Sequence, residues 1–347
     1  MFDLPEHLIA QDPPAERGQS RLLIIDRSGQ RLEHRMVRDL PSILSRGTVM
    51  VFNNSRVRRA RLLGVSEETG AQVEFLLLDK LQKQGEEAGF TWRVMVQRAR
   101  RRRPGNRYLF HCRDPKDNLG AEITGEDGEF RLLKFDRPVD DAWLDINGHV
   151  PLPPYIKRLD SDFDWERYQT VYAEEYGSAA APTAGLHFTN ELLAELETAG
   201  IEITFITLHV GLGTFLPVRV ENVEDHKMHE ENYYISEETA SRIEKARAEG
   251  RKVVAVGTTS LRTLESAWKE GPPAGLQRGS GNTSIFIYPG YKIKAADALF
   301  TNFHTPGSTL VMLVAAIAGR DFILDSYKEA VKEGYRFFSY GDACLIL

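Results

Sequence analysis

The alternation of apolar and polar positions divides the chain into two kinds of segment. From about Pro151 onward, stretches with helical periodicity alternate with short apolar runs that are typical of buried strands. The clearest pair is a helix capped by Thr189, with Leu192, Leu193 and Leu196 on one face, followed by a strand over 201–208. Further helices are expected over 236–250, 259–268, 309–318 and 325–333, and further strands over 252–256 and 298–301. This alternation predicts an α/β layer with a largely parallel sheet.

The first 60 residues continue this layer, and a segment with a different pattern follows them. Strands are expected over 21–26, 31–35 and 48–53, and Asp39 is expected to cap a short helix. Between about 61 and 144 only short β-like runs occur, at 73–78, 90–96, 108–111, 121–124 and 130–135, and Asp127-Gly128 suits a hairpin turn. We therefore predict an α/β protein with a main α/β layered domain (1–60 plus 145–347) and an inserted small antiparallel β-barrel domain (61–144).

Composition restricts the class of protein. Hydrophobic residues make up 42% and charged residues 27%, which permits a large core and excludes a disordered or collagen-like chain. The net charge of −6 excludes a histone-like polycation. Cys112 and Cys344 are too few for a disulfide framework or a Cys-rich zinc site. A single bridge between them is one alternative, and a reduced, cytoplasmic chain is the simpler interpretation. The apolar run 309–319 is far shorter than the roughly 20 residues that span a bilayer, so we expect no membrane partner.

Two arginine clusters stand out against this negative net charge. One follows a predicted buried strand and contains Arg56, Arg58, Arg59 and Arg61. The other covers 93–113, contains eight arginines and no Asp or Glu, and includes the run Arg100-Arg101-Arg102-Arg103. Such density suits the backbone of a polyanion such as RNA, while a solvated loop or hinge is the alternative interpretation.

Polar or glycine-rich segments fall where predicted strands end and helices begin, which is where α/β proteins bind ligands. The segments are 180–189, 209–215, 226–231, 256–266, 301–309 and 335–343. The second of them resembles half a dinucleotide fingerprint, but Leu216 stands where the third glycine is required. His226 and His229 have a spacing that could hold a metal, yet their neighbours form no recognised zinc motif. Each segment also has a structural interpretation as helix caps or buried hydrogen bonds, so none decides the function alone.

Taken in order, these segments resemble the S-adenosylmethionine:tRNA ribosyltransferase-isomerase family of queuosine biosynthesis. The resemblance runs from Phe2-Asp3-Leu4-Pro5 to the last residues and rests on 151–156 (PLPPYI), 167–173, 181–189, 209–215, 256–266, 302–309 and 335–346. Where the family often has an apolar residue and a Lys or Arg beside the proline of the 302–309 motif, this chain has Thr305 and Gly307-Ser308, which leaves a phosphate or carboxylate contact there open. Cys344 replaces a common Met.

The resemblance implies an unusual use of S-adenosylmethionine as a cosubstrate. Its ribosyl portion would move to the aminomethyl group of 7-aminomethyl-7-deazaguanine at the tRNA wobble position, giving epoxyqueuosine with release of adenine and methionine. No metal is required by this chemistry, because the sulfonium itself acidifies the neighbouring ribose carbon. The attacking amine must be neutral and adenine leaves better when protonated, so a base and an acid are expected. We expect a cytoplasmic monomer whose partners are this tRNA and S-adenosylmethionine.

Roles for individual residues are hypotheses, and those of the arginines rest on the density of positive charge. The candidates for acid or base catalysis are His187, His209, His229, Glu230 and Asp342. The candidates for cosubstrate binding are Thr183, Gly211, Gly213, Thr214, Thr258, Thr259, Ser260, Arg262, Asn302 and His304. The candidates for tRNA backbone contact are Arg56, Arg58, Arg100, Arg101, Arg102 and Arg103.

Two other functions remain as alternatives. An ordinary S-adenosylmethionine methyltransferase would carry an early glycine-rich loop after its first strand, and this chain lacks one. A non-catalytic RNA-binding module would explain the arginine run but would leave the histidine and threonine loops without a role.

Overall fold

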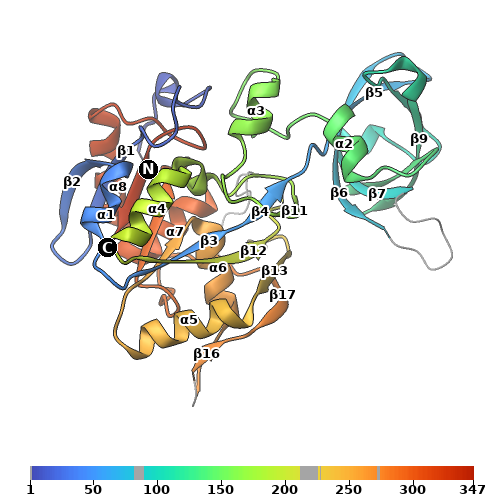
Figure 1. The fold of residues 1–347 in the computed structure, drawn as a ribbon. Coiled ribbons are helices and arrows are strands. Elements are labelled where there is room, and N and C mark those ends of the chain that lie inside the picture. The colour runs from blue at the N-terminus through green and yellow to red at the C-terminus, as the bar shows by residue number, and fades with distance from the viewer. Residues whose placement is uncertain (1, 82–89, 212–225, 227, 272–273) are drawn as a thin grey trace. The chain divides into compact units, whose positions relative to one another are not determined.

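The computed structural model describes residues 2–81, 90–211, 226, 228–271 and 274–347, and the chain forms two compact units (Figure 1). The larger unit comprises Met1–Arg56, Pro153–Arg158 and Arg167–Leu347, and the smaller comprises Val57–Leu152 and Leu159–Glu166. The limits proposed from the sequence, 60/61 and 144/145, both lie within the smaller unit. A layered α/β unit and a closed antiparallel barrel confirm the predicted fold class.

A nine-stranded sheet forms the centre of the larger unit, in the order β17-β13-β12-β3-β14-β18-β19-β1-β2. The strands are β1 (Arg21–Asp26), β2 (Arg31–Met36), β3 (Val49–Asn53), β12 (Glu202–Leu208), β13 (Glu231–Ile235), β14 (Val253–Val256), β17 (Gly279–Thr283), β18 (Ala298–Asn302) and β19 (Ala343–Ile346). Strands β12, β3, β14 and β18 run parallel to one another. Every residue of β3, β14 and β18 is buried, as expected for parallel strands covered on both faces.

Helices cover both faces of this sheet. They are α1 (Leu40–Ile43), α4 (Asn190–Thr198), α5 (Glu237–Ala248), α6 (Thr258–Ala267), α7 (Thr309–Ala318) and α8 (Arg320–Lys332). Residues of α1 and α4 contribute to one hydrophobic cluster, and residues of α5, α6, α7 and α8 contribute to the other. The predicted caps are present, because the hydroxyls of Thr189 and Ser236 each accept a hydrogen bond from a first-turn N–H at 3.1 Å. Asp39 precedes α1 as expected, but its carboxylate accepts from the Met36 N–H instead.

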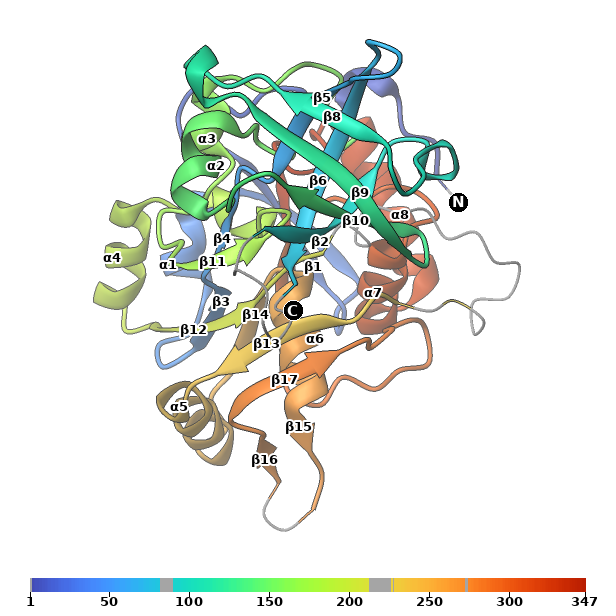
Figure 2. The ribbon, with the colours of Figure 1, turned by 90° about the vertical axis from the view of Figure 1, so that its right-hand side faces the viewer.

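Short strands with alternating burial form the closed barrel of the smaller unit (Figure 2). In barrel order they are β10 (Phe130–Phe135), β7 (Thr91–Val96), β6 (Gln72–Lys80), β5 (Arg61–Ser66), β8 (Arg107–Phe110) and β9 (Leu119–Asp127). Strand β5 was absent from the five predicted runs. Gly64 allows close packing there, because a Cβ would lie 2.9 Å from the Phe110 ring and 3.2 Å from the Phe75 ring.

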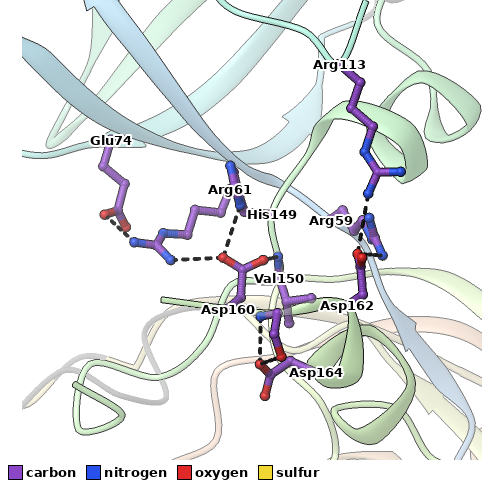
Figure 3. Close-up of polar contacts among 10 residues, drawn as sticks. Arg59, Arg61, Glu74, Arg113, His149, Val150, Asp160, Asp162 and Asp164 are labelled. Atoms are coloured by element: carbon purple, nitrogen blue, oxygen red, sulfur yellow. Dashed lines mark hydrogen bonds and ion pairs between the residues drawn. The ribbon is translucent and has the colours of Figure 1, made fainter. Parts of the chain in front are cut away.

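The segment Leu159–Glu166 belongs to the smaller unit and is held there by the partly buried carboxylate of Asp160 (Figure 3). Asp160 lies 3.0 Å from His149 Nδ1 and 3.7 Å from Arg61, and it accepts the Val150 N–H at 2.9 Å. Burial raises the pKa of Asp160, but these hydrogen bonds and the Arg61 charge outweigh it and hold the pKa below its ordinary value. The carboxylate therefore fixes the start of this segment against β5 and the end of α2 (Asp141–Asn147).

A second, more exposed carboxylate holds α3 (Asp162–Arg167) in the same unit (Figure 3). Asp162 pairs with Arg113 at 3.4 Å and with Arg59 at 3.9 Å. Arg59 also stacks over the Trp165 ring at 4.5 Å. Arginines of both sequence clusters are thus used for internal contacts in this unit.

Candidate functional site

A cavity of about 250 Å³ lies at the carboxyl ends of the adjacent strands β14 and β18. Three of the segments singled out in the sequence supply most of its wall, through Ala181–Ala184, Gly257–Thr259 and Thr301–Ser308. Val210, Leu310, Tyr155, Phe338 and Ser339 complete the lining. This is the position at which parallel α/β sheets bind ligands, and the volume is close to the lower end of the ~300–1,000 Å³ usual for small-molecule sites.

Asn302 connects three of the wall segments. Its Oδ1 accepts from Thr183 Oγ1 at 3.1 Å, and its Nδ2 donates to His187 Nε2 at 2.8 Å and to the Phe338 carbonyl at 3.2 Å. Because Nε2 of His187 accepts this bond, its proton resides on Nδ1, which faces Ser20 Oγ at 2.9 Å. The structure thereby brings together three predicted residues, Thr183, His187 and Asn302.

The two buried histidines near Asn302 are electrically neutral at neutral pH. Burial, assisted by the positive charge of Arg336, lowers the pKa of His187 to about 3. Burial alone lowers the pKa of His304 to about 3, and its Nε2 lies 3.1 Å from Thr301 Oγ1. His304 lines the cavity, whereas His187 lies behind Asn302 and uses both ring nitrogens internally. Neither can supply a proton as an imidazolium ion at neutral pH.

Helix α6 begins at the cavity. Gly257, with φ +89°, precedes it and offers no side chain to accept from the first N–H groups. Thr258 and Thr259 line the cavity, and each is 7% exposed. Ser260 instead donates to the Val256 carbonyl at the end of β14, at 2.8 Å. Of the predicted α6 residues, the two threonines are therefore placed to contact a ligand.

Arg262, one turn further along α6, forms a buried ion pair outside the cavity lining. Its guanidinium lies 2.5 Å from the Glu231 carboxylate, and both side chains are 4% exposed. Glu231 also accepts the Gly211 N–H at 3.0 Å. The pair therefore ties α6 to β13 and to the predicted residue Gly211.

The remaining acid and base candidates lie apart from the cavity lining. His229 and Glu230 are exposed, and Glu230 accepts from Asn282 Nδ2 at 2.6 Å. His209 is partly buried beside Gly177 and immediately precedes Val210, which does line the cavity. The predicted residues Gly213 and Thr214 lie outside the described residues.

Asp342 fixes the loop that brings Phe338 and Ser339 to the cavity. Its Oδ1 accepts from the Arg21 N–H and its Oδ2 from the Arg336 N–H, both at 2.8 Å. The carboxylate is 4% exposed and thus links β1 to both ends of the loop 336–342. Asp342 therefore positions the loop 336–342 and is not among the residues that line the cavity.

Sequence reasoning missed the aromatic wall of the cavity. Tyr155 and Phe338 stack with ring centroids 4.3 Å apart and an angle of 24° between the planes. Tyr155 Oη is hydrogen-bonded to Ser339 Oγ. Both segments were recognised as family motifs, but nothing in the local sequence shows that a tyrosine and a phenylalanine so far apart would meet.

The arginine run lies on a loop of the barrel unit, at a short 3-10 turn, Ala99–Arg101. Arg100, Arg101 and Arg103 are exposed, and among the described residues none of them forms an ion pair. Buried Arg131 holds this loop by donating to the carbonyls of Arg102 at 2.7 Å and Ala99 at 2.8 Å.

The other two predicted tRNA contacts are less accessible. Arg58 is paired with Asp141 and is 13% exposed. Arg56 is partly buried, over the ring of Tyr176 at 4.7 Å. The exposed loop 98–103 is therefore the stronger candidate for a polyanion contact.

The described part of the chain has neither a cluster of metal-binding side chains nor a helix that could cross a membrane. No three His, Cys, Asp or Glu side chains there come together as a metal site. None of the described helices has the length and apolar character needed to cross a membrane.

Comparison with known proteins gives one consistent result. The sequence pattern of a family described as "Queuosine biosynthesis protein" matches residues 1–346. An S-adenosylmethionine:tRNA ribosyltransferase-isomerase of Treponema denticola is 55% identical, over 100% of this chain and 98% of that protein. The enzyme of the same name from Clostridioides difficile is 49% identical, over 99% and 98%. A crystal structure of an S-adenosylmethionine tRNA ribosyltransferase from Thermotoga maritima matches with a TM-score of 0.56 and 35% identity, covering 100% of this chain and 99% of that one.

Proposed function

The chain belongs to the queuosine biosynthesis protein family, and on that premise we propose that it acts as an S-adenosylmethionine:tRNA ribosyltransferase-isomerase. The ribosyl portion of S-adenosylmethionine passes to the aminomethyl group of 7-aminomethyl-7-deazaguanine at the tRNA wobble position. The products are epoxyqueuosine in the tRNA, adenine and methionine. The observation that carries this proposal is the cavity at the ends of β14 and β18, where three family motifs converge on one hollow.

The cavity supports chemistry that needs no charged side chain in its wall. The sulfonium of the cosubstrate acidifies the adjacent C5′–H bonds, so a base can remove one proton there. The amine nitrogen gives up a proton as it bonds to a ribosyl carbon, the bonds to sulfur and to adenine break, and the ribosyl carbons rearrange to the epoxide-bearing ring of epoxyqueuosine. Methionine leaves as the neutral thioether, and adenine leaves with one of the released protons. The neutral imidazole of His304 and the hydroxyls of Thr258, Thr259 and Thr301 are the wall groups that can exchange hydrogen bonds with these atoms. Thr183 and Asn302 also line the cavity, and the hydrogen bond between them helps to fix its wall.

The exposed arginine loop supports tRNA binding by the barrel unit. Arg100, Arg101 and Arg103 are available for phosphate contacts, and Arg131 presents the loop that carries them. Replacing the three exposed arginines by glutamine should weaken tRNA binding and reduce the slope of log affinity against log salt by about 2 to 3. An unchanged slope would remove this loop from the tRNA contact. We place the reaction in the cytoplasm and the enzyme as a monomer.

The decisive experiment is mass spectrometry of tRNA nucleosides after incubation of the pure protein with S-adenosylmethionine and tRNA that carries the 7-aminomethyl-7-deazaguanine base. We expect epoxyqueuosine in the tRNA and equal amounts of free adenine and methionine. An Asn302→Ala variant, which loses the bonds that join three wall segments, is the matched control and should be strongly impaired. S-adenosylhomocysteine as the product would identify a methyltransferase, and absence of any product would indicate an RNA-binding protein.

A further inference from the structure

We propose that the cavity holds S-adenosylmethionine in one orientation, with its methionine carboxylate at the N-terminus of α6 and its adenine against the Tyr155–Phe338 pair. This inference rests on the proposed function and adds the direction in which the cosubstrate lies. It follows from the different chemistry of two parts of the cavity wall, which belong to the same unit of the structure.

The α6 part of the wall is suited to an anion. The first N–H groups of a helix lack intrahelical partners and carry the positive end of the helix dipole. Gly257 leaves them without a side-chain cap. Thr259, which is 7% exposed, has a buried Oγ1 for which the described residues supply no hydrogen-bond partner. This hydroxyl lies close to the helix start, since a Cβ on Gly257 would be 3.5 Å from it. A bound carboxylate would satisfy both the hydroxyl and the N–H groups.

Phe338 and Tyr155 provide an apolar, aromatic part of the wall. Their stacked rings form an apolar wall suited to a purine ring, which stacks on aromatic side chains. Phe338 has φ +70°, a left-handed conformation that is unusual for a residue with a large side chain. Its N–H donates to the Phe303 carbonyl at 3.1 Å, and its own carbonyl accepts from Asn302 at 3.2 Å. Both bonds join the Phe338 backbone to the segment Asn302-Phe303, so they hold the ring at a defined place in the wall.

The charges of the wall decide between the two possible directions. No Lys, Arg, Asp or Glu is present among the described lining residues. The helix start is therefore the main source of positive potential for a carboxylate in the described wall. A carboxylate placed against the aromatic rings would face their negatively polarised surfaces. Adenine carries no charge, so it gains little from the helix dipole and much from the rings.

The test separates the two ends with conservative variants. Phe338→Asn removes the ring but tolerates the left-handed backbone, and Phe338→Tyr keeps the ring as the matched control. Tyr155→Leu, with Tyr155→Phe as its control, tests the same wall if Phe338→Asn does not fold. Thr259→Val removes only the hydroxyl, and Thr259→Ser restores it. Adenosine and methionine are used as separate competitors of turnover, and KM is measured for both S-adenosylmethionine and tRNA.

We expect each variant to weaken inhibition by a different competitor. Phe338→Asn should raise KM for S-adenosylmethionine about tenfold and weaken inhibition by adenosine, while inhibition by methionine and KM for tRNA stay unchanged. Thr259→Val should weaken inhibition by methionine and leave that by adenosine unchanged. The reverse pattern, or equal loss of both competitors in each variant, would overturn the proposed orientation. If the unaltered protein releases no adenine and methionine, the proposed function itself fails, which is a different result.

Discussion

Replacing Arg262 by methionine removes the guanidinium that faces the Glu231 carboxylate. Both side chains are 4% exposed and their charged atoms lie 2.5 Å apart, so water cannot readily take the place of the lost partner. Breaking a buried pair on one side only costs about 3–5 kcal/mol, because a charge stays in a poorly solvated position. We therefore expect Arg262→Met to lower the free energy of unfolding by about that amount and the melting temperature by roughly 10 °C.

The assay has to report on the larger unit alone. Three of the four tryptophans, Trp92, Trp143 and Trp165, lie in the barrel unit, so intrinsic fluorescence mainly follows that unit. Far-ultraviolet circular dichroism during urea titration follows α4 to α8, all of which belong to the larger unit. Coincidence of the two signals would show whether the units unfold together.

Two control variants test whether the loss of stability comes from the unpaired buried charge. Arg262→Met combined with Glu231→Gln removes the buried charge but keeps an oxygen that can accept the Gly211 N–H, so it should recover at least half of the loss. Arg278→Met breaks a pair with Glu244 at 2.8 Å, but Arg278 is 39% exposed, so this change should cost less than about 1 kcal/mol. A loss below about 1 kcal/mol for Arg262→Met, or a double variant no more stable than the single one, would refute the argument. A raised KM for S-adenosylmethionine at unchanged stability would instead place Arg262 in contact with the cosubstrate.

Three further predictions concern groups that position the site. Because the pKa values of His187 and His304 fall to about 3 in the folded state, the unfolded state binds more protons between about pH 3 and 6.5. The free energy of unfolding should therefore fall as pH is lowered through this window, by up to about 1.4 kcal/mol per pH unit for each histidine, and urea titrations of His304→Gln should show a shallower fall. Asp342→Asn removes one acceptor for the N–H groups of two segments and should lower stability by about 1–3 kcal/mol, whereas an unchanged urea midpoint would show that the loop 336–342 holds without it. Arg131→Met should weaken tRNA binding in a filter assay although Arg131 is buried, because the loop 98–103 loses two carbonyl contacts, and unchanged affinity would contradict this.

Much of the larger unit could be predicted from local sequence because its signals are local. Hydroxyl caps such as Thr189 and Ser236, and continuous apolar runs such as that of β14, identify elements without knowledge of their neighbours. Strand β5 gave a weaker signal, because its residue types, with Leu62 beside Leu63 and then Gly64, do not alternate between apolar and polar although their burial does. Such a short segment becomes recognisable as a strand only when its partners β6 and β8 are known.

The candidate site, too, could be predicted only where the signal lies in the local sequence. The expectation that ligands bind where strands end and helices begin placed Thr259, Asn302 and His304 near one cavity. These residues do line it. The absence of acidic residues within 93–113 could not show that Arg93 and Arg107 pair with carboxylates from other parts of the barrel unit, those of Asp79 and Asp136. The contact between Tyr155 and Phe338 likewise depends on the tertiary fold, which cannot be predicted from residue types and spacings along the sequence.

The position of β19 in the sheet has a consequence for incomplete chains. Its residues, Ala343–Ile346, lie between β18 and β1, pairing antiparallel with the former and parallel with the latter. A polypeptide cut short before Ala343 would leave β18 and β1 with open edges inside the sheet, and such edges recruit other chains. Truncated copies should accordingly precipitate or be degraded rather than persist as partly active protein.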